Sequence, residues 1–170
     1  NDRIQLNEAE KLMHDRIIEK HMRNGVTMHF PDSIYIEDGV EIGSDTELDR
    51  NVELLNGTKI GCGCVIGMNS RLDGAVIGNN ADILSSVILQ SEIGDGAHVG
   101  PFAYVGEHAV VGKGCQIYAG VVIEERATVG DDCLFYPNVS VYHDCKIGNR
   151  VTLHSGCVIG ADGYDDMNLY

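Results

Sequence analysis

The sequence predicts an all-β fold, a single-stranded parallel β-helix of about seven triangular coils with an N-terminal α-helix. The first observation is that an aliphatic or aromatic residue returns at every sixth position from Ile93 to Ile159. The second is a mostly small side chain two positions before each of these, and the third is a glycine directly after many of them. A period of six fits neither an α-helix nor a single hairpin, whereas a short fixed repeat is typical of a solenoid.

The large residues of the repeat are predicted to point inward. In an extended segment, positions two apart lie on the same side, so the small and the large residue of each hexad share the interior. A short strand, a turn and a short strand, repeated three times, closes one triangular coil, and Gly-Asp and Gly-Asn pairs supply the turns. The later block is Ile93, Val99, Val105, Val111, Ile117, Ile123, Val129, Phe135, Val141, Ile147, Leu153 and Ile159, and the earlier block is Ile36, Ile42, Leu48, Leu54, Ile60, Ile66 and Leu72.

The repeat is irregular between the two blocks. From Leu72 to Ile93, three of the four steps between core residues are five residues long. We interpret this stretch as shortened turns within one solenoid and not as a domain boundary.

The first 25 residues are predicted to form a separate linker helix. Asn7 and Glu10 form a candidate capping box, and Gly25 is a natural stop. Leu6, Met13 and Ile17 lie on one apolar stripe, which we expect to pack on the first coils or on a neighbouring subunit. The predicted organisation is a helix at 1–25, the β-helix at 34–163 and a tail at 164–170.

Charge and cysteine content restrict the partners. The net charge of −14 argues against binding to nucleic acid or to an anionic membrane surface, and no apolar run is long enough to span a membrane. Five of the six cysteines occupy the small interior position: Cys64, Cys115, Cys133, Cys145 and Cys157. We therefore expect no metal site and no disulfide, which favours a cytoplasmic location, and we expect Cys62 alone to react in the folded protein.

The first part of the chain resembles a known enzyme family. Asn1–Leu6, Glu19–Met22, Ile66–Ser70 and Gly100–Ala103 carry this resemblance. Residues 1–103 resemble the bifunctional N-acetylglucosamine-1-phosphate uridyltransferase and glucosamine-1-phosphate acetyltransferase that makes UDP-N-acetylglucosamine. Residues 115–163 resemble a different enzyme, the UDP-3-O-acylglucosamine N-acyltransferase of the lipid A pathway, through Gln116–Ile123, Tyr136–Asp144 and His154–Gly163.

Both families are hexapeptide-repeat acyltransferases, and the resemblance implies a left-handed β-helix and a homotrimer. An acyl-CoA or UDP-sugar ligand is also implied, with acetyl-CoA or acyl carrier protein as donor if the chain is active. The combination of two families looks like a mosaic. Because the chain also begins and ends within the domains of both families, we expect an engineered or generated chain.

The motifs that carry catalysis in both families are missing. Tyr104–His108 stands where the first family has arginines that hold phosphate, and Glu107 has the wrong charge for this role. His143, beside Asp144, and His154 are the only weak candidates for a catalytic base, and surface or subunit-contact roles are the alternative. Tyr104, Tyr118, Tyr136 and Tyr142 are predicted interface residues.

The sequence is compatible with two functions. One is a self-associating scaffold without a complete active site. The other is an N-acyltransferase acting on a nucleotide-linked or phosphorylated amino sugar.

Overall fold

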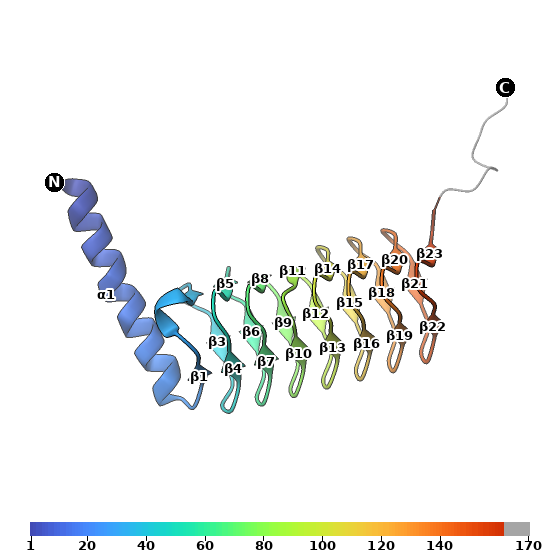
Figure 1. Cartoon of the computed structure of the whole chain (residues 1–170), viewed down its shortest axis with the longest axis horizontal. Coiled ribbons are helices and arrows are strands. Elements are labelled where there is room, and N and C mark those ends of the chain that lie inside the picture. Colours follow the sequence, from blue (N-terminus) through green and yellow to red (C-terminus); the bar gives the residue numbers. More distant parts are fainter. Residues whose placement is uncertain (162–170) are drawn as a thin grey trace, which may run out of the picture.

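One helix and a continuous run of short parallel strands make up residues 1–161, the part of the chain that the computed structural model describes (Figure 1). Helix α1 (Asp2–Arg23) is followed by a left-handed solenoid in which each coil stacks on the one before it. Between them lie strand β1 (Thr27–Met28) and the short 3₁₀ helix Pro31–Ser33. The predicted tail at 164–170 lies outside the described residues, as do Asp162 and Gly163. The predicted all-β solenoid with one N-terminal helix is confirmed.

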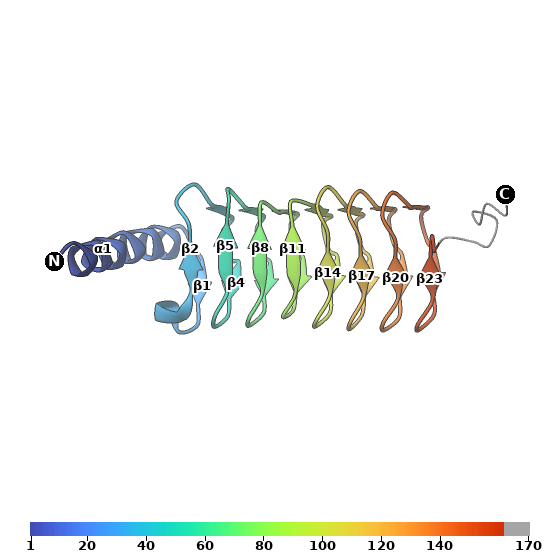
Figure 2. The same ribbon diagram turned by 90° about the horizontal axis from the view of Figure 1, so that it is seen from above.

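Three parallel sheets form the three sides of the solenoid (Figures 1 and 2). Sheet A contains β1 (Thr27–Met28), β4 (Glu47–Leu48), β7 (Val65–Ile66), β10 (Asp82–Ile83), β13 (His98–Val99), β16 (Gln116–Ile117), β19 (Leu134–Phe135) and β22 (Thr152–Leu153). Sheet B contains β2 (Tyr35–Ile36), β5 (Glu53–Leu55), β8 (Arg71–Asp73), β11 (Val87–Leu89), β14 (Tyr104–Val105), β17 (Val122–Ile123), β20 (Ser140–Val141) and β23 (Val158–Ile159). Sheet C contains β3 (Glu41–Ile42), β6 (Lys59–Ile60), β9 (Val76–Ile77), β12 (Glu92–Ile93), β15 (Val110–Val111), β18 (Thr128–Val129) and β21 (Lys146–Ile147).

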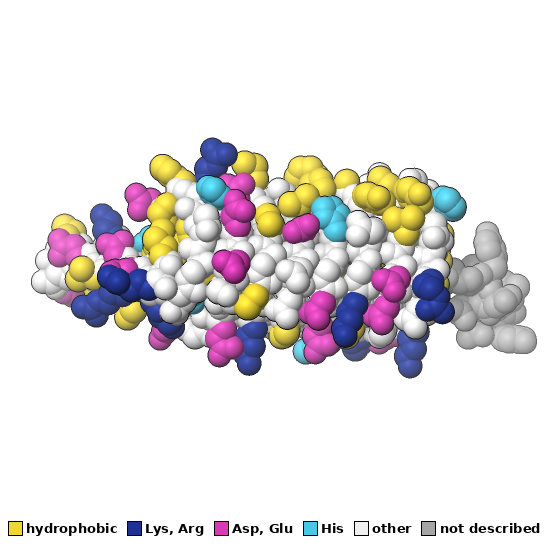
Figure 3. Space-filling view, turned by 90° about the horizontal axis from the view of Figure 1, so that it is seen from below, with side chains coloured by type: hydrophobic (Ala, Val, Ile, Leu, Met, Phe, Trp, Pro, Cys, Tyr) yellow, Lys and Arg dark blue, Asp and Glu magenta, His cyan; other side chains and the backbone are white. Residues whose placement is uncertain are grey.

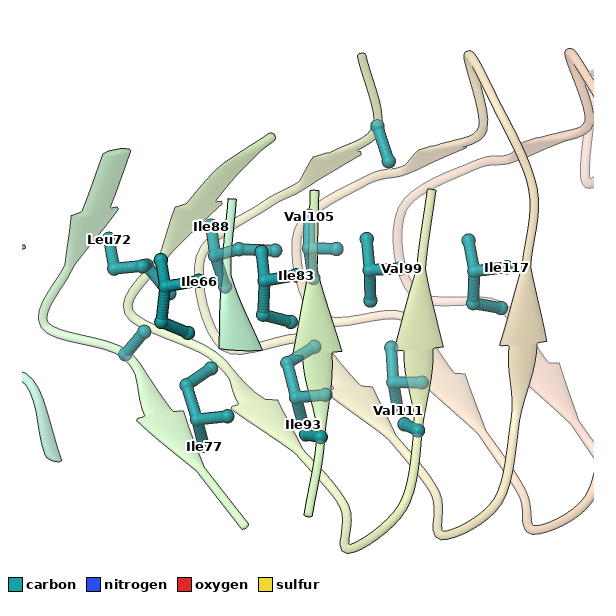
Figure 4. Packing of buried hydrophobic residues seen from close by; sticks show 14 of the residues in the cluster. Ile66, Leu72, Ile77, Ile83, Ile88, Ile93, Val99, Val105, Val111 and Ile117 are labelled. Atoms are coloured by element: carbon teal, nitrogen blue, oxygen red, sulfur yellow. The ribbon is translucent and has the colours of Figure 1, made fainter. Parts of the chain in front are cut away.

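The repeat of the sequence lies inside this prism. Each strand pairs with the strand one coil away, so that Val99 lies beside Ile83 and Ile117. Figure 4 shows these core residues as rows that run along the solenoid axis. Of the predicted interior residues from Ile93 to Val141, every one is buried. The predicted inward register is therefore confirmed across the middle of the chain.

The irregular stretch between the two blocks does not interrupt the sheets. Strand β8 pairs with β5 and β11, and β9 pairs with β6 and β12, in continuous register. Shortened turns absorb the five-residue steps, as the sequence predicts.

The corner that leads from sheet C to sheet A is a column of glycines, one per coil. A Cβ atom placed on Gly112 would lie 2.4 Å from the carbonyl oxygen of Gly130, and one on Gly61 would lie 2.8 Å from Gly78. Real Cβ contacts are not that short, so only glycine lets the coils stack this closely here. The column consists of Gly43, Gly61, Gly78, Gly94, Gly112, Gly130 and Gly148.

The helix begins earlier than predicted. Asn1 is the N-cap, and its side-chain oxygen accepts a hydrogen bond from the Arg3 backbone N–H at 3.0 Å. Asn7 lies inside the helix, so the candidate capping box with Glu10 is wrong. The helix ends at Arg23, just before Gly25, whose φ of +91° is left-handed.

Only the C-terminal half of α1 packs on the solenoid (Figure 1). Ile18 and His21 are buried, whereas Leu6 and Met13 remain 61% and 51% exposed. Of the predicted Leu6, Met13 and Ile17 face, Ile17 packs against the core as predicted, whereas the packing of Leu6 and Met13 is wrong within one chain. The reason is geometric: the helix is inclined to the axis of the solenoid (Figure 1), and its first turns extend beyond the end of the solenoid (Figure 2).

The N-terminal end of the solenoid differs from the predicted bound, and the C-terminal end is less buried than predicted. Thr27–Met28 already pairs with Glu47–Leu48, so sheet A begins before residue 34. At the other end Cys145 and Cys157, predicted to be interior, are only partly buried, while Cys64, Cys115 and Cys133 are buried. The last coil of the described chain has a neighbouring coil on one side only, which leaves its interior residues partly open. Cys62 is exposed, as predicted.

Candidate functional site

The first candidate base, His143, lies on the corner that leads from sheet B to sheet C. Its Nδ1 lies 2.9 Å from Oδ2 of Asp144, within hydrogen-bond distance. Neighbouring side chains on a strand point apart, and the sequence alone gave no reason to expect this contact. The pair lies in a turn, where Asp144 adopts a left-handed φ of 62° that turns its carboxylate toward the imidazole.

Two residues from the preceding coil complete this cluster. Arg126 donates from Nε and Nη2 to the two oxygens of Asp144, at 2.7 and 3.0 Å. Glu124 accepts the His143 backbone N–H at 3.0 Å. Arg126 and Asp144 are 18 residues apart, which is the length of one coil. The stacking of successive coils therefore places the two side chains on the same corner.

The charges of the cluster set its protonation. The Arg126 guanidinium, followed by His143, lowers the pKa of Asp144 well below its usual range. The hydrogen bond from His143 to the Asp144 carboxylate raises the pKa of the imidazole above its ordinary value. The ring lies on an exposed corner, and its contact with Asp144 shifts the equilibrium toward the protonated form. A protonated imidazole is a poor general base, although it can donate a proton or hold an anion.

The second candidate base, His154, belongs to a different corner. It stacks on Tyr136 with ring centroids 5.3 Å apart and planes 7° apart. Tyr136 stacks in turn on Tyr118 at 5.7 Å. These three rings, one per coil, form an aromatic ladder on the corner that leads from sheet A to sheet B.

The structure does not bring the two candidate histidines together, because His143 follows sheet B and His154 follows sheet A. His154 is exposed and stacks on Tyr136, which fits the surface role that the sequence named as the alternative, and its role stays a prediction. Figure 3 shows histidine and hydrophobic side chains gathered along one edge of the solenoid toward its C-terminal end.

Of the other five histidines, four are buried or contact other residues, and His108 is exposed. Nε2 of His14 lies 2.8 Å from the Ile34 carbonyl oxygen, and His98 faces Asp82 at 3.8 Å. His29 contacts Glu47, and burial lowers the pKa of His21. Within residues 1–161, no three metal-ligating side chains converge on a common point, and no helix is long and apolar enough to cross a membrane.

Sequence reasoning missed Arg126 as a partner of the His143 pair. The signal that could have found it is the coil length, since residues 18 apart lie side by side on one corner. The same spacing joins Arg71 to Glu53 and Asn51 to Asn69. A search for opposite charges at this spacing identifies the cluster without coordinates.

Comparison with known families gives a direct match to the repeat. Residues 90–125 and 126–161 match the family described as bacterial transferase hexapeptide (six repeats). The chain is a hexapeptide-repeat protein. The matched residues cover the coils that hold both the His143 cluster and the aromatic ladder.

Curated relatives align with the whole length of this chain. The bifunctional protein GlmU of Caldanaerobacter subterraneus subsp. tengcongensis is 40% identical over 164 residues, which are 96% of this chain and 35% of that protein. The bifunctional protein GlmU of Enterococcus faecalis is 37% identical over 170 residues, 100% of this chain and 36% of that protein. This hexapeptide-repeat chain thus spans little more than a third of these relatives. The alignments continue past residue 103, and a mosaic origin stays a prediction.

Solved structures of acyltransferases share the solenoid at low identity. A variant of GDP-perosamine N-acetyltransferase from Caulobacter crescentus, solved with CoA and GDP-perosamine, is 17% identical with a TM-score of 0.43, covering 82% of this chain and 60% of that one. UDP-N-acetylglucosamine O-acyltransferase from Moraxella catarrhalis is 16% identical with a TM-score of 0.34, covering 81% and 66%. Neither likeness carries a functional inference.

Proposed function

We propose that this chain is a self-associating β-helix that assembles as a homotrimer. The observation that carries the proposal is the C-terminal part of the outer row of sheet B, which is uncharged in a chain whose net charge is −14. From β11 onward, the outward residues of the row are Val87, Tyr104, Val122, Ser140 and Val158.

This row has the character of an interface core. Tyr104 and Val158 are 38% and 49% exposed in the single chain, so part of their apolar surface is in contact with water. Charged residues are depleted and tyrosine is enriched where protein surfaces meet. A prism with three flat sides suits closed threefold symmetry, and the resembled acyltransferase families supply the precedent for a trimer.

Sedimentation equilibrium at micromolar concentration tests the assembly. We expect three times the chain mass of 18.4 kDa for the native protein and the single-chain mass for Val122→Glu, which places a charge in the middle of the row. Thr128→Glu, on sheet C of the same coil, is the matched control and keeps the native mass. A native protein that sediments as a monomer, or a Val122→Glu variant with the native mass, contradicts the proposal.

We also propose that this chain does not turn over acyl donors. Acyl transfer to an amine needs an unprotonated base and a donor that stabilises the oxyanion. The raised pKa of His143 disfavours the unprotonated form, and the imidazole faces open water. The acidic Glu107 also lies where the resembled acetyltransferase family has phosphate-binding arginine.

The second candidate function is acyl transfer itself, and the contact between His143 and Asp144 favours it. A carboxylate on Nδ1 fixes the imidazole and leaves Nε2 free to take a proton. The hexapeptide family that matches the chain is described as a transferase family.

Release of free thiol distinguishes the two functions. One assay offers glucosamine-1-phosphate with acetyl-CoA, and another offers UDP-acyl-glucosamine with an acyl carrier protein. We expect no rate above the uncatalysed background in either assay. Steady turnover that disappears in His143→Ala but persists in His108→Ala, a nearby exposed histidine, would establish the transferase.

A further inference from the structure

The proposed trimer needs a surface that receives the uncharged row of sheet B. The contact between neighbours in a threefold ring is heterologous, so sheet B of one copy packs on a different surface of the next copy. The surfaces available are the other two sheets and the corners between the sheets (Figures 1 and 2). The shape of the prism and the charge of its corners select one of them.

Triangular prisms in a threefold ring cannot lay two flat sides together. The three sheets form the three sides of the solenoid and face directions a third of a turn apart. A threefold rotation is also a third of a turn, so with parallel solenoid axes it never turns one side to face another side directly. What lies opposite a side of a triangle is a corner. Sheet B therefore meets a corner of the neighbour, and the rotation allows only the two corners that adjoin sheet B, one for each direction around the ring.

The first of these is the B–C corner, the turns that lead from sheet B to sheet C, and it is charged. Glu107, Arg126 and Asp144 are exposed on it in three consecutive coils, and Glu124 and Glu125 are half-buried beside them. Taking charged groups out of water is costly unless each gains a partner. The row on sheet B offers no charge from β11 onward, so the B–C corner is a poor match for it.

The second is the A–B corner, the turns that lead from sheet A to sheet B, and it is aromatic. Phe102 is 80% exposed on it, and the aromatic ladder of Tyr118, Tyr136 and His154 runs along it. None of its turn residues in these coils is Asp, Glu, Lys or Arg: residues 100–102, 118–120, 136–138 and 154–156. Aromatic residues are enriched and charged residues depleted at the core of protein interfaces. The A–B corner therefore matches the row on sheet B.

The backbone of Phe102 is a second, independent sign of contact on this corner. Its φ of 61° is left-handed, which is unfavourable for a bulky side chain. The same turn position one, two and three coils later holds Gly120, Asn138 and Gly156, residue types that accept this conformation. Such strain clusters at sites of function. Burial against a second copy gives the exposed ring of Phe102 a stabilising role that it lacks within one chain.

The levels of the row and the corner along the solenoid also agree. A closed threefold rotation has no shift along its axis, so the surfaces that meet lie at the same level of the solenoid. The uncharged row runs from Val87 to Val158, and the aromatic corner runs through the same coils, from residue 100 to residue 156. Toward the N-terminus both become charged, at Arg71 in the row and at Arg50 in the corner.

We propose that the A–B corner of each copy packs on the sheet B row of the next copy, with the Tyr118 ring of one copy against Val122 of its neighbour. Sheet C and the corner that leads from it to sheet A then face water, which fits the exposed charged residues there: Glu92, Lys113, Asp131 and Lys146. This packing rests on the proposed trimer and does not depend on acyl transfer.

Sedimentation equilibrium of corner variants tests the packing, with circular dichroism to check folding. Tyr118→Glu places a charge on the A–B corner, and we expect the mass to fall from that of three chains to that of one. His108→Glu places the same charge on an exposed residue of the B–C corner and should keep the native mass. A Tyr118→Glu variant with the native mass, or a His108→Glu variant that sediments as a monomer, overturns the proposal.

A disulfide between copies decides the case in which Tyr118→Glu does not fold. In a Cys62→Ser background, Tyr118→Cys and Val122→Cys chains are refolded together and oxidised with copper phenanthroline. We expect covalent dimers that join residue 118 to residue 122, identified by peptide mapping and found only in the mixture. His108→Cys is the matched control for the other corner and should give no link to Val122→Cys. A link from residue 108 in place of residue 118 contradicts the proposal.

The same measurements separate this packing from the trimer itself. A native protein that sediments as a monomer contradicts both the trimer and the packing. A native trimer that is lost in Val122→Glu but kept in Tyr118→Glu supports the trimer and the sheet B row, and contradicts only the contact with the A–B corner.

Discussion

The middle coils and the last described coil use the same six-residue repeat, yet they are buried to different degrees. In the middle, Phe135, Val139 and Val141 are fully buried. In the last coil, Leu153 at the Phe135 position is 9% exposed, and Cys157 and Ile159, at the Val139 and Val141 positions, are only partly buried. The residue types are alike, so the difference comes from position: an interior residue of a solenoid is covered by the coils on both sides.

The N-terminal end behaves differently from the C-terminal end of the described chain. There, α1 lies against the first coil, and both Ile18 and Val26 are buried. The comparison teaches that the repeat specifies which side chains point inward, while the neighbours of a coil decide how much each contributes to stability. Four predictions test this, from the largest expected effect to the smallest.

Core truncation should show the largest contrast. Phe135→Ala removes a ring that is 0% exposed, and we expect it to lower the free energy of unfolding by about 3 to 5 kcal/mol. Ile159→Ala removes a partly exposed side chain of the last coil and should cost less than half of that. Guanidinium unfolding followed by circular dichroism measures both. Equal losses would show that the last coil is as well covered as the middle.

The glycine column allows the middle and the last coil to be compared by adding a methyl group instead of removing a side chain. Gly112→Ala forces a Cβ to within 2.4 Å of the Gly130 carbonyl oxygen and should cost about 1 to 3 kcal/mol. Gly148→Ala meets no atom within 4 Å and should stay within about 0.5 kcal/mol of the native protein. The same unfolding experiment measures both, and a harmless Gly112→Ala would contradict the close stacking of the coils.

Thiol reactivity should follow the same gradient without any change of stability. Burial raises the pKa of Cys115 to about 11, so the reactive thiolate is scarce near pH 8. We expect iodoacetamide to modify Cys62 first, Cys157 of the last coil more slowly, and Cys115 only after unfolding. Peptide mapping by mass spectrometry gives the order. Rapid labelling of Cys115 in folded protein would disprove the inward register.

The smallest effect concerns the exposed charges near the C-terminal end. NMR titration should give His143 a pKa above 6.5, and Asp144→Asn should lower it. Because the folded pKa is raised, the stabilising contribution is present below pH 6.5 and is lost as the pH rises through the folded pKa. Added salt should weaken the shift, since the pair is exposed. An unchanged His143 pKa in Asp144→Asn would show that the contact between His143 and Asp144 does not form in solution.

The sequence predicted most of the fold because one pattern repeats many times. A wrong assignment at a single position does not change the predicted register, because the core positions from Ile93 to Val141 all agree on it. The helix start was different, since Asn1 and Asn7 are equally good caps by residue type, and only the contact between Asn1 and the Arg3 N–H distinguishes them. The burial of Leu6 and Met13 depended on the direction of the helix, which no local pattern encodes.

The candidate site was predictable only in part. His143 stands beside Asp144 in the sequence, and a coil length of 18 residues is sufficient to find Arg126 as their neighbour. The contact itself depends on the left-handed backbone of Asp144, which the residue types alone do not show.

By itself, the sequence determined the solenoid, its interior rows and its glycine corner, because these follow from local alternation and from the steric limits of each residue. The tertiary structure alone decided the geometry of the pair formed by Arg126 and Asp144 and the stacking of the rings in the aromatic ladder. Each of those is a relation between coils, and residues that meet there are separated by a full turn of the chain.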